Sequence, residues 1–158
     1  MKKGLILGRF QPLHMGHLSL FEAVIDEGHE LLVCIGSSNE KRTENNPYNS
    51  FERIRMIREV LSKYKCKYNI FEIPDINNND LYVKHLKSIV PEFDLVYTGN
   101  KLVRMLFENA GYTVIVPNLI NREAWQGASI RQAMKDGDDW EMDVPASVAN
   151  IISEIELS

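Results

Sequence analysis

Short apolar runs alternate with amphipathic segments along almost the whole chain. Five apolar runs have the length and character of strands buried on both faces of a sheet: residues 4–8, 31–35, 68–73, 95–98 and 112–116. Apolar residues recur at helical spacing in the segments between and after these runs: residues 18–26, 50–64, 81–90, 102–109, 130–135 and 145–155. The order of the two patterns is therefore strand, helix, strand, helix throughout.

This alternation predicts an α/β fold: a Rossmann-like, doubly wound parallel sheet of about five strands with helices on both faces. Residues 37–47 and 117–127 show no periodicity and are expected to be loops. No linker or repeat interrupts the pattern, so residues 1–158 are expected to form a single domain. Ligands of such sheets bind beyond the carboxyl ends of the strands, where strand order reverses. We therefore expect the chemistry to lie just after Gly8, Gly36 and Thr98.

Composition narrows the class of protein. The chain carries 22 Asp and Glu residues against 18 Lys and Arg, a net charge of −4. Proteins that bind nucleic-acid backbones usually show the opposite balance, so no nucleic-acid partner is expected. No apolar stretch approaches the ~20 residues of a membrane span, and Cys34 and Cys66 lack the spacing of a metal or disulfide motif. A cytoplasmic protein with no membrane partner is expected.

The segment after the first strand, GRFQPLHMGH at residues 8–17, is typical of a phosphate site. Gly8 permits a tight turn, and Arg9 offers a charged fork for phosphate oxygens. His14 and His17 are three residues apart, so one helical turn would place both imidazoles on one side. A helix expected to begin near His17 would add its N-terminal N–H groups. Two histidines can also bind zinc, but no third ligand lies nearby, and we favour phosphate.

The same string closely resembles the H-x-G-H signature of the nucleotidyltransferase superfamily. More narrowly, it resembles the opening of archaeal-type nicotinamide-nucleotide adenylyltransferases, G-R-[MF]-Q-P-x-H-x-G-H. Further segments match that family in one register: VCIGS at 33–37, NPY at 46–48, FER at 51–53 and YTGNKLV at 97–103. The resemblance implies transfer of AMP from ATP to nicotinamide mononucleotide (NMN), giving NAD and pyrophosphate. Mg²⁺ bound to the phosphates is expected, with no metal ligand from the protein, and the preference among metals stays open.

The resemblance also assigns roles to residues. The catalytic group, expected to form a local cationic cluster, comprises Arg9, His14, His17 and Arg131. The residues expected to bind ATP are Gly8, Phe10, Gly16, Gly99, Asn100, Trp125, Ser129 and Ile130. Those expected to bind NMN are Gln11, Pro12, Gly36, Ser37, Asn79, Leu81 and Tyr82. Trp125 stands where relatives have tyrosine, and packing over the core is its alternative role.

The chain departs from the family pattern at both phosphate ends. GASIR at residues 127–131 resembles the closing signature, in which hydroxyls and an arginine at a helix start hold the ATP phosphates. Relatives have threonine where this chain has Ala128, so either Ser129 or a backbone N–H would take its place. Some relatives have a second arginine where this chain has Asn45, and Lys41 or Arg42 is the candidate replacement.

The acceptor end matches the family segment D-I-x-x-N-x-L-W-V at residues 75–83, DINNNDLYV. Tyr82 replaces tryptophan and still offers a flat face to a cationic pyridinium ring, although packing at a helix start is its alternative role. Asn79 has both a donor and an acceptor for a carboxamide. The choice between nicotinamide and nicotinic acid mononucleotide stays open.

Other functions stay open as alternatives. These are a sibling adenylyltransferase that uses nicotinic acid mononucleotide, phosphopantetheine or flavin mononucleotide, and a nucleotide-binding module without catalysis. His29 and His85 are expected to be structural or surface residues, and residues 136–139 (DGDD) to cap helices rather than bind metal. Because members of the family form hexamers, the resemblance implies a homo-oligomer.

Overall fold

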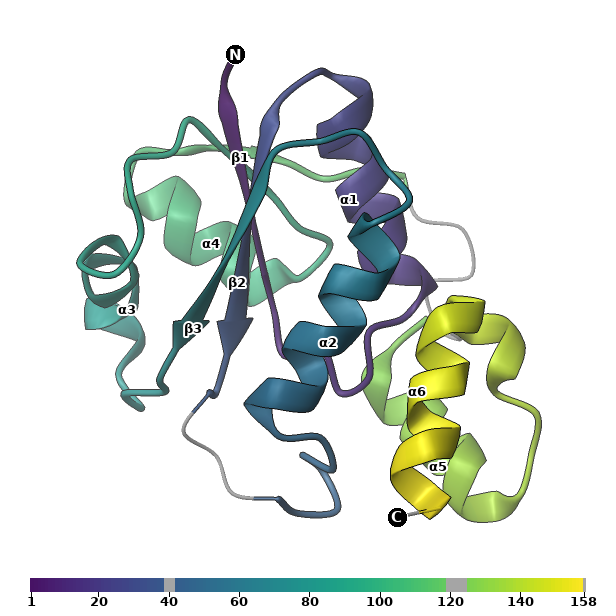
Figure 1. The fold of residues 1–158 in the computed structure, drawn as a ribbon. Helices are drawn as coiled ribbons and strands as arrows, with labels where there is room; N and C mark the ends of the chain where they lie inside the picture. The colour runs from purple at the N-terminus through teal and green to yellow at the C-terminus, as the bar shows by residue number, and fades with distance from the viewer. Residues whose placement is uncertain (39–41, 119–124, 158) are drawn as a thin grey trace.

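A computed structural model describes residues 1–38, 42–118 and 125–157 of the chain (Figure 1). Five strands form one parallel sheet in the order β3-β2-β1-β4-β5. The strands are β1 (Lys3–Gly8), β2 (Glu30–Gly36), β3 (Tyr68–Ile73), β4 (Leu95–Tyr97) and β5 (Thr113–Ile115). The helices are α1 (Met15–Asp26), α2 (Ser50–Leu61), α3 (Asn79–Lys87), α4 (Lys101–Asn109), α5 (Gly127–Asp136) and α6 (Ala146–Leu157), with a 3₁₀ turn, η1, at Glu141–Asp143. The Rossmann-like α/β prediction is confirmed.

Helices cover both faces of the sheet: α3 and α4 lie on one face, and α1, α2 and α6 on the other (Figure 1). Alternate residues of the central strands feed the two cores. On the α3–α4 side the core is built from Leu5, Leu32, Cys34, Val83, Leu86 and Phe107. On the opposite side it is built from Ile6, Val33, Ile35, Phe21, Ile57, Val148 and Ile152. Burial on both faces is the reason that β1 and β2 are continuous apolar runs.

Helix starts are the part of the prediction that needs correction. α1 begins at Met15, before the expected Leu18, because the His14 side chain caps it. α3 begins at Asn79, since the Asn78 side chain accepts from two backbone N–H groups of the first turn. α5 begins at Gly127 instead of Ile130. Apolar periodicity marks only the buried face of a helix, so a polar first turn escapes it.

The sheet order places a reversal between β1 and β4, the two strands that follow β2 in the sheet. The carboxyl ends of these strands open toward the loops after Gly8 and Tyr97, where a ligand site is expected. Among the helices that the structure describes, none is long and apolar enough to cross a membrane.

Candidate active site

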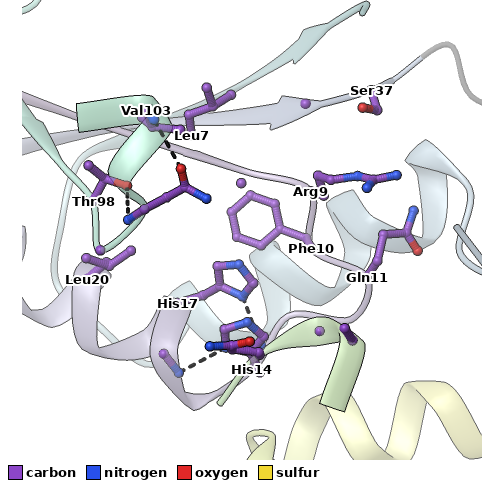
Figure 2. A pocket seen from close by; sticks show the side chains of 18 of the residues that line it. Leu7, Arg9, Phe10, Gln11, His14, His17, Leu20, Ser37, Thr98 and Val103 are labelled. Atoms are coloured by element: carbon purple, nitrogen blue, oxygen red, sulfur yellow. Dashed lines mark hydrogen bonds between the residues drawn. The ribbon is translucent and has the colours of Figure 1, made fainter. Parts of the chain in front are cut away.

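A cavity of about 520 Å³ lies at the carboxyl ends of β1, β2 and β4 (Figure 2). Its walls come from the loop after β1, the first turn of α1, and the starts of α4 and α5. The predicted site residues that line it are Gly8, Arg9, Phe10, Gln11, His14, Gly16, His17, Gly36, Ser37, Tyr82, Gly99, Asn100, Trp125 and Arg131. Segments more than a hundred residues apart in sequence therefore meet at one site.

The two histidines form the capping box of α1. His14 Nδ1 accepts a hydrogen bond from the backbone N–H of Gly16 at 3.1 Å, and His17 Nδ1 accepts one from the backbone N–H of His14, also at 3.1 Å. The two rings stack with their centroids 3.8 Å apart. Because each Nδ1 is an acceptor, the proton of each neutral ring is on Nε2. The pair therefore offers two Nε2–H donors to a ligand.

Glycine makes this arrangement possible. A Cβ added to Gly16 would lie 2.8 Å from Cε1 of His14 and 3.2 Å from the carbonyl oxygen of Trp125, so only glycine lets the capping ring fold over the helix start. On the other side of the pair, the ring of Phe10 lies beside His17, with centroids 4.4 Å apart (Figure 2). Phe10 thus packs against the ring of His17, and the missing side chain of Gly16 leaves room for the ring of His14.

Burial keeps both histidines neutral near pH 7. It lowers the pKa of His14 from 6.5 to about 4. The pKa of His17 also lies well below 6.5, mainly through burial and further through the neighbouring His14. The expectation of a cluster with four cations is therefore corrected, because at neutral pH the full charges are those of the arginines and the histidines act as uncharged donors.

We expect this histidine pair to make stability fall in mild acid. The unfolded chain takes up protons below pH 6.5 while folded His14 stays neutral to about pH 4, so the free energy of unfolding should drop across that window. The shift corresponds to about 3 kcal/mol at pH 4 from His14 alone, and His17 adds in the same direction. Urea unfolding at a series of pH values measures it.

The matched variant is His14→Asn, whose Oδ1 can still accept from the Gly16 N–H but does not titrate. The difference in unfolding free energy between wild type and variant isolates His14 from the carboxylates that titrate in the same range. A pH dependence that is the same in the two proteins would contradict the assignment.

Two arginines supply the charge of the site. The Arg9 guanidinium donates to the side-chain oxygen of Asn46, and Arg131 Nη1 donates to the carbonyl oxygen of Gln11 at 2.8 Å. Burial lowers the pKa of Arg131, and the charge of Arg9 lowers it further, so the two guanidiniums act on one region. A Cβ added to Gly127 would lie 2.8 Å from Arg131 Nη1, so glycine at this helix start leaves room for the guanidinium.

The chain is similar to known proteins over nearly its whole length. A family model described as cytidylyltransferase-like matches residues 5–133. The nicotinamide-nucleotide adenylyltransferase of Methanococcus aeolicus is 40% identical over 154 residues, which are 98% of this chain and 90% of that protein. The chain belongs to this nucleotidyltransferase family. The nicotinamide-nucleotide adenylyltransferase of Pyrococcus furiosus is also 40% identical, over 98% of this chain and 85% of its own length.

Solved structures with low sequence identity share the fold of this chain. The bifunctional NMN adenylyltransferase/ADP ribose pyrophosphatase of Francisella tularensis, complexed with AMP and a manganese ion, gives a TM-score of 0.72 at 18% identity. That match covers 91% of this chain and 44% of the longer protein. The NadR protein in complex with NAD and AMP-PNP gives a TM-score of 0.59 at 16% identity, over 85% of this chain and 43% of its own.

In this nucleotidyltransferase, several predicted residues lie away from the cavity. Ile130 is 1% exposed, because it packs in the core on the side of the sheet covered by α1, α2 and α6. Leu81 and Asn79 lie exposed on the first turn of α3, while Tyr82 reaches the cavity from the same turn. Pro12 is buried and Ser129 exposed, and neither lines the cavity, whereas the neighbouring Ala128 does.

The loop before α2 gives no replacement cation for Asn45 among its described residues. Arg42 donates to the carbonyl oxygen of Pro47 at 2.6 Å and to Glu52 Oε1 at 2.9 Å, and it does not line the cavity. Lys41, the other candidate, lies outside the described residues. Arg42 therefore links the loop to the first turn of α2 through these hydrogen bonds.

Some residues of the cavity wall had no ligand role assigned from the sequence, although several lie in the segments that match the family: Leu7, Leu20, Asp75, Thr98, Leu102, Val103, Gln126, Gly127 and Ala128. Thr98 ends the fourth strand run, where the rule of carboxyl ends had placed the chemistry, and the same rule applied after the third strand could have found Asp75. The three leucines and the valine lie in regular apolar patterns. Such a pattern does not show whether an apolar side chain lines a cavity or packs in the core. Asn100 also has a structural role, since its side chain caps α4 by accepting from the Val103 N–H at 3.1 Å.

Proposed function

We propose that the protein is an adenylyltransferase that transfers AMP from ATP to NMN, forming NAD and releasing pyrophosphate. The observation that carries the proposal is the cavity lined jointly by Arg9, His14, His17 and Arg131, with the ring of Tyr82 on the same cavity. The naming of relatives at 40% identity over 98% of the chain supports the same reaction.

The chemistry needs no covalent intermediate on the protein. The 5′-phosphate oxygen of NMN attacks the α-phosphorus of ATP in line, a new P–O bond forms, and the bond to the pyrophosphate oxygen breaks. Negative charge builds on the transferred phosphoryl oxygens and on the leaving pyrophosphate. The Nε2–H groups of His14 and His17 are suited to donate to these oxygens, and Arg9 and Arg131 to neutralise their charge.

We expect Mg²⁺ to enter this site bound to the phosphate oxygens of the substrate. No group of three or more His, Cys, Asp and Glu side chains in the described part of the chain could hold a metal ion. Phosphate oxygens and water are the usual ligands of Mg²⁺ at such sites. When bound, Mg²⁺ would neutralise part of the triphosphate charge.

At the acceptor end, Tyr82, Gly36 and Ser37 lie on the same cavity as the histidines. The Tyr82 ring suits the cationic pyridinium of NMN. The Gln11 side chain is already engaged with the protein, because its Nε2 donates to the Tyr48 carbonyl at 2.8 Å and its Oε1 accepts from the Tyr48 N–H at 2.9 Å. Gln11 therefore shapes the cavity through the loop that it holds.

An acceptor assay tests the reaction. Purified protein is incubated with ATP and Mg²⁺ together with NMN, nicotinic acid mononucleotide, phosphopantetheine or flavin mononucleotide, and pyrophosphate release is measured. We expect the highest kcat/KM with NMN and no release without an acceptor. A higher kcat/KM with another acceptor would identify a sibling enzyme. ATP binding with no release for any acceptor would identify a nucleotide-binding module.

The homo-oligomeric state and the cytoplasmic location are further parts of this proposal. They follow from the family resemblance, and light scattering of the purified protein tests the first of them.

A further inference from the structure

Arg53, on the first turn of α2, is a buried arginine that bonds to two loops of the site. Only 1% of its surface is exposed. Its Nη1 donates to the carbonyl oxygen of Arg9 at 2.9 Å and to that of Gly36 at 3.0 Å. Its Nε donates to the Asn49 carbonyl and its Nη2 to the Ser50 hydroxyl, both at 3.3 Å. One nitrogen thus bridges the loop after β1 and the loop after β2.

The partners of this cation are unusual. Buried arginines are generally paired with a carboxylate, yet no Asp or Glu among the described residues forms an ion pair with Arg53. Burial lowers its pKa and the charge of nearby Arg9 lowers it further, while the more distant charge of Glu72, which forms no ion pair with it, raises it in part. Burying a charged guanidinium among uncharged hydrogen-bond partners costs free energy. This indicates that the several donors of the guanidinium have a role at this position in the fold.

The two carbonyl groups bonded by Arg53 Nη1 lie at equivalent positions at the ends of β1 and β2. The β1–β2 ladder ends with Gly8 opposite Ile35, and the carbonyls bonded by Arg53 come next on each strand. The residue after each carbonyl lies in the left-handed region: Phe10 at φ 54° and Ser37 at φ 52°. Residues with a side chain rarely adopt this conformation, which costs roughly 1–2 kcal/mol each.

Each of these carbonyls belongs to the same peptide unit as the nitrogen of the left-handed residue that follows. Fixing the carbonyl therefore fixes the peptide plane on which φ of Phe10 or Ser37 depends. Phe10 and Ser37 both line the cavity, as does Arg9, while Arg53 itself does not. The bridging nitrogen thus acts on the shape of the cavity without reaching it.

We propose that Arg53 is a positioning residue, whose guanidinium holds the Arg9–Phe10 and Gly36–Ser37 peptide units so that the phosphate-binding loops are preformed. This inference rests on the proposed function, because preformed loops matter for binding and aligning nucleotide phosphates. Arg53 thus supports the loop after β1 and the loop after β2 together through one guanidinium.

The test uses Arg53→Lys, which keeps the charge but not the two-carbonyl bridge, and Arg53→Gln, which has no charge to bury. Arg55→Lys is the matched control, since Arg55 lies on the same helix and pairs with Glu154 at the surface at 2.7 Å. We expect both Arg53 variants to lose at least tenfold in kcat/KM for ATP and NMN at a temperature where they are folded, and the control to stay within twofold. A folded Arg53 variant within threefold of wild type overturns the proposal.

A second substitution separates positioning from general stability. Ser37→Gly supplies a residue that adopts a positive φ without steric cost. The double variant Arg53→Lys with Ser37→Gly should therefore have a kcat/KM at least threefold higher than Arg53→Lys alone. If Arg53→Lys lowers kcat/KM by the same factor in the wild-type and the Ser37→Gly background, the proposal is overturned. Loss of folding in every Arg53 variant also overturns it, because Arg53 would then act on the whole fold and not on these loops.

ATP binding by calorimetry separates this inference from the proposed function. A wild-type protein that binds ATP without using NMN would overturn the function alone. The Arg53 variants would still be expected to bind ATP at least tenfold more weakly than wild type, and unchanged affinity would overturn the positioning role.

Discussion

Replacing His17 with asparagine is expected to lower kcat by about 100- to 1,000-fold, the usual effect of removing one donor from a site of charge development. The Oδ1 of asparagine can take the place of His17 Nδ1 and accept from the His14 N–H, so the start of α1 is retained. What the variant loses is the Nε2–H. We therefore expect its melting temperature and its Kd for ATP to change little.

Steady-state kinetics and calorimetry on the same preparation measure the two effects. Ser19→Ala is the control on the same helix, because the Ser19 hydroxyl bonds only to the Met15 carbonyl, at 3.0 Å, among the described contacts, and does not line the cavity. Turnover of His17→Asn near the wild-type value, with ATP still bound, would show that this donor does not act in the reaction.

The neutral state of the histidines adds a pH criterion to the same experiment. Since the pKa of His14 is about 4 and that of His17 lies well below 6.5, neither ring changes protonation between pH 7 and 8. The ratio of wild-type to His17→Asn turnover should then be constant over that range. A ratio that changes steeply there would mean that His17 titrates and acts as an acid or a base.

The sequence was sufficient for the parts of this molecule that depend on local pattern. The apolar runs predicted all five strands and the parallel sheet, since a strand buried on both faces needs a continuous apolar segment. The spacing of His14 and His17 predicted that the rings would lie side by side, and they stack at 3.8 Å. The starts of α1 and α3 were placed too late, because they depend on the capping side chains of His14 and Asn78, whereas the start of α2 at Ser50 was predicted correctly.

The features that the sequence could not predict depend on contacts between distant segments. Gln11 bonds to Tyr48, 37 residues away, and to Arg131, 120 residues away. Arg53 lies in FER at 51–53, which matched the family, but the sequence assigned it no role, and its burial under the two loops follows from the way α2 packs. The neutral, Nε2-protonated histidines likewise required the capping geometry, which residue spacing does not specify.

Replacing Arg131 with glutamine is expected to lower kcat/KM for ATP by about 100-fold, because a charged donor beside the transferred phosphates is lost. Arg131→Lys should recover only part of this loss. Lysine keeps the charge but has no planar fork that donates to the Gln11 carbonyl and to a phosphate oxygen together. Both variants should show a steeper loss for ATP than for NMN, since Arg131 enters the cavity from the start of α5.

Lys135→Gln on the same helix is the matched control for Arg131. Lys135 lies one turn further along α5, is exposed, and pairs at the surface with Glu44 at 2.7 Å, so it carries the same charge without facing the cavity. A surface pair of this kind contributes little, and its loss should leave kcat/KM within twofold of wild type. If Lys135→Gln lowers kcat/KM for ATP as much as Arg131→Gln does, the overall charge of the helix, and not a direct contact from Arg131, accounts for the effect.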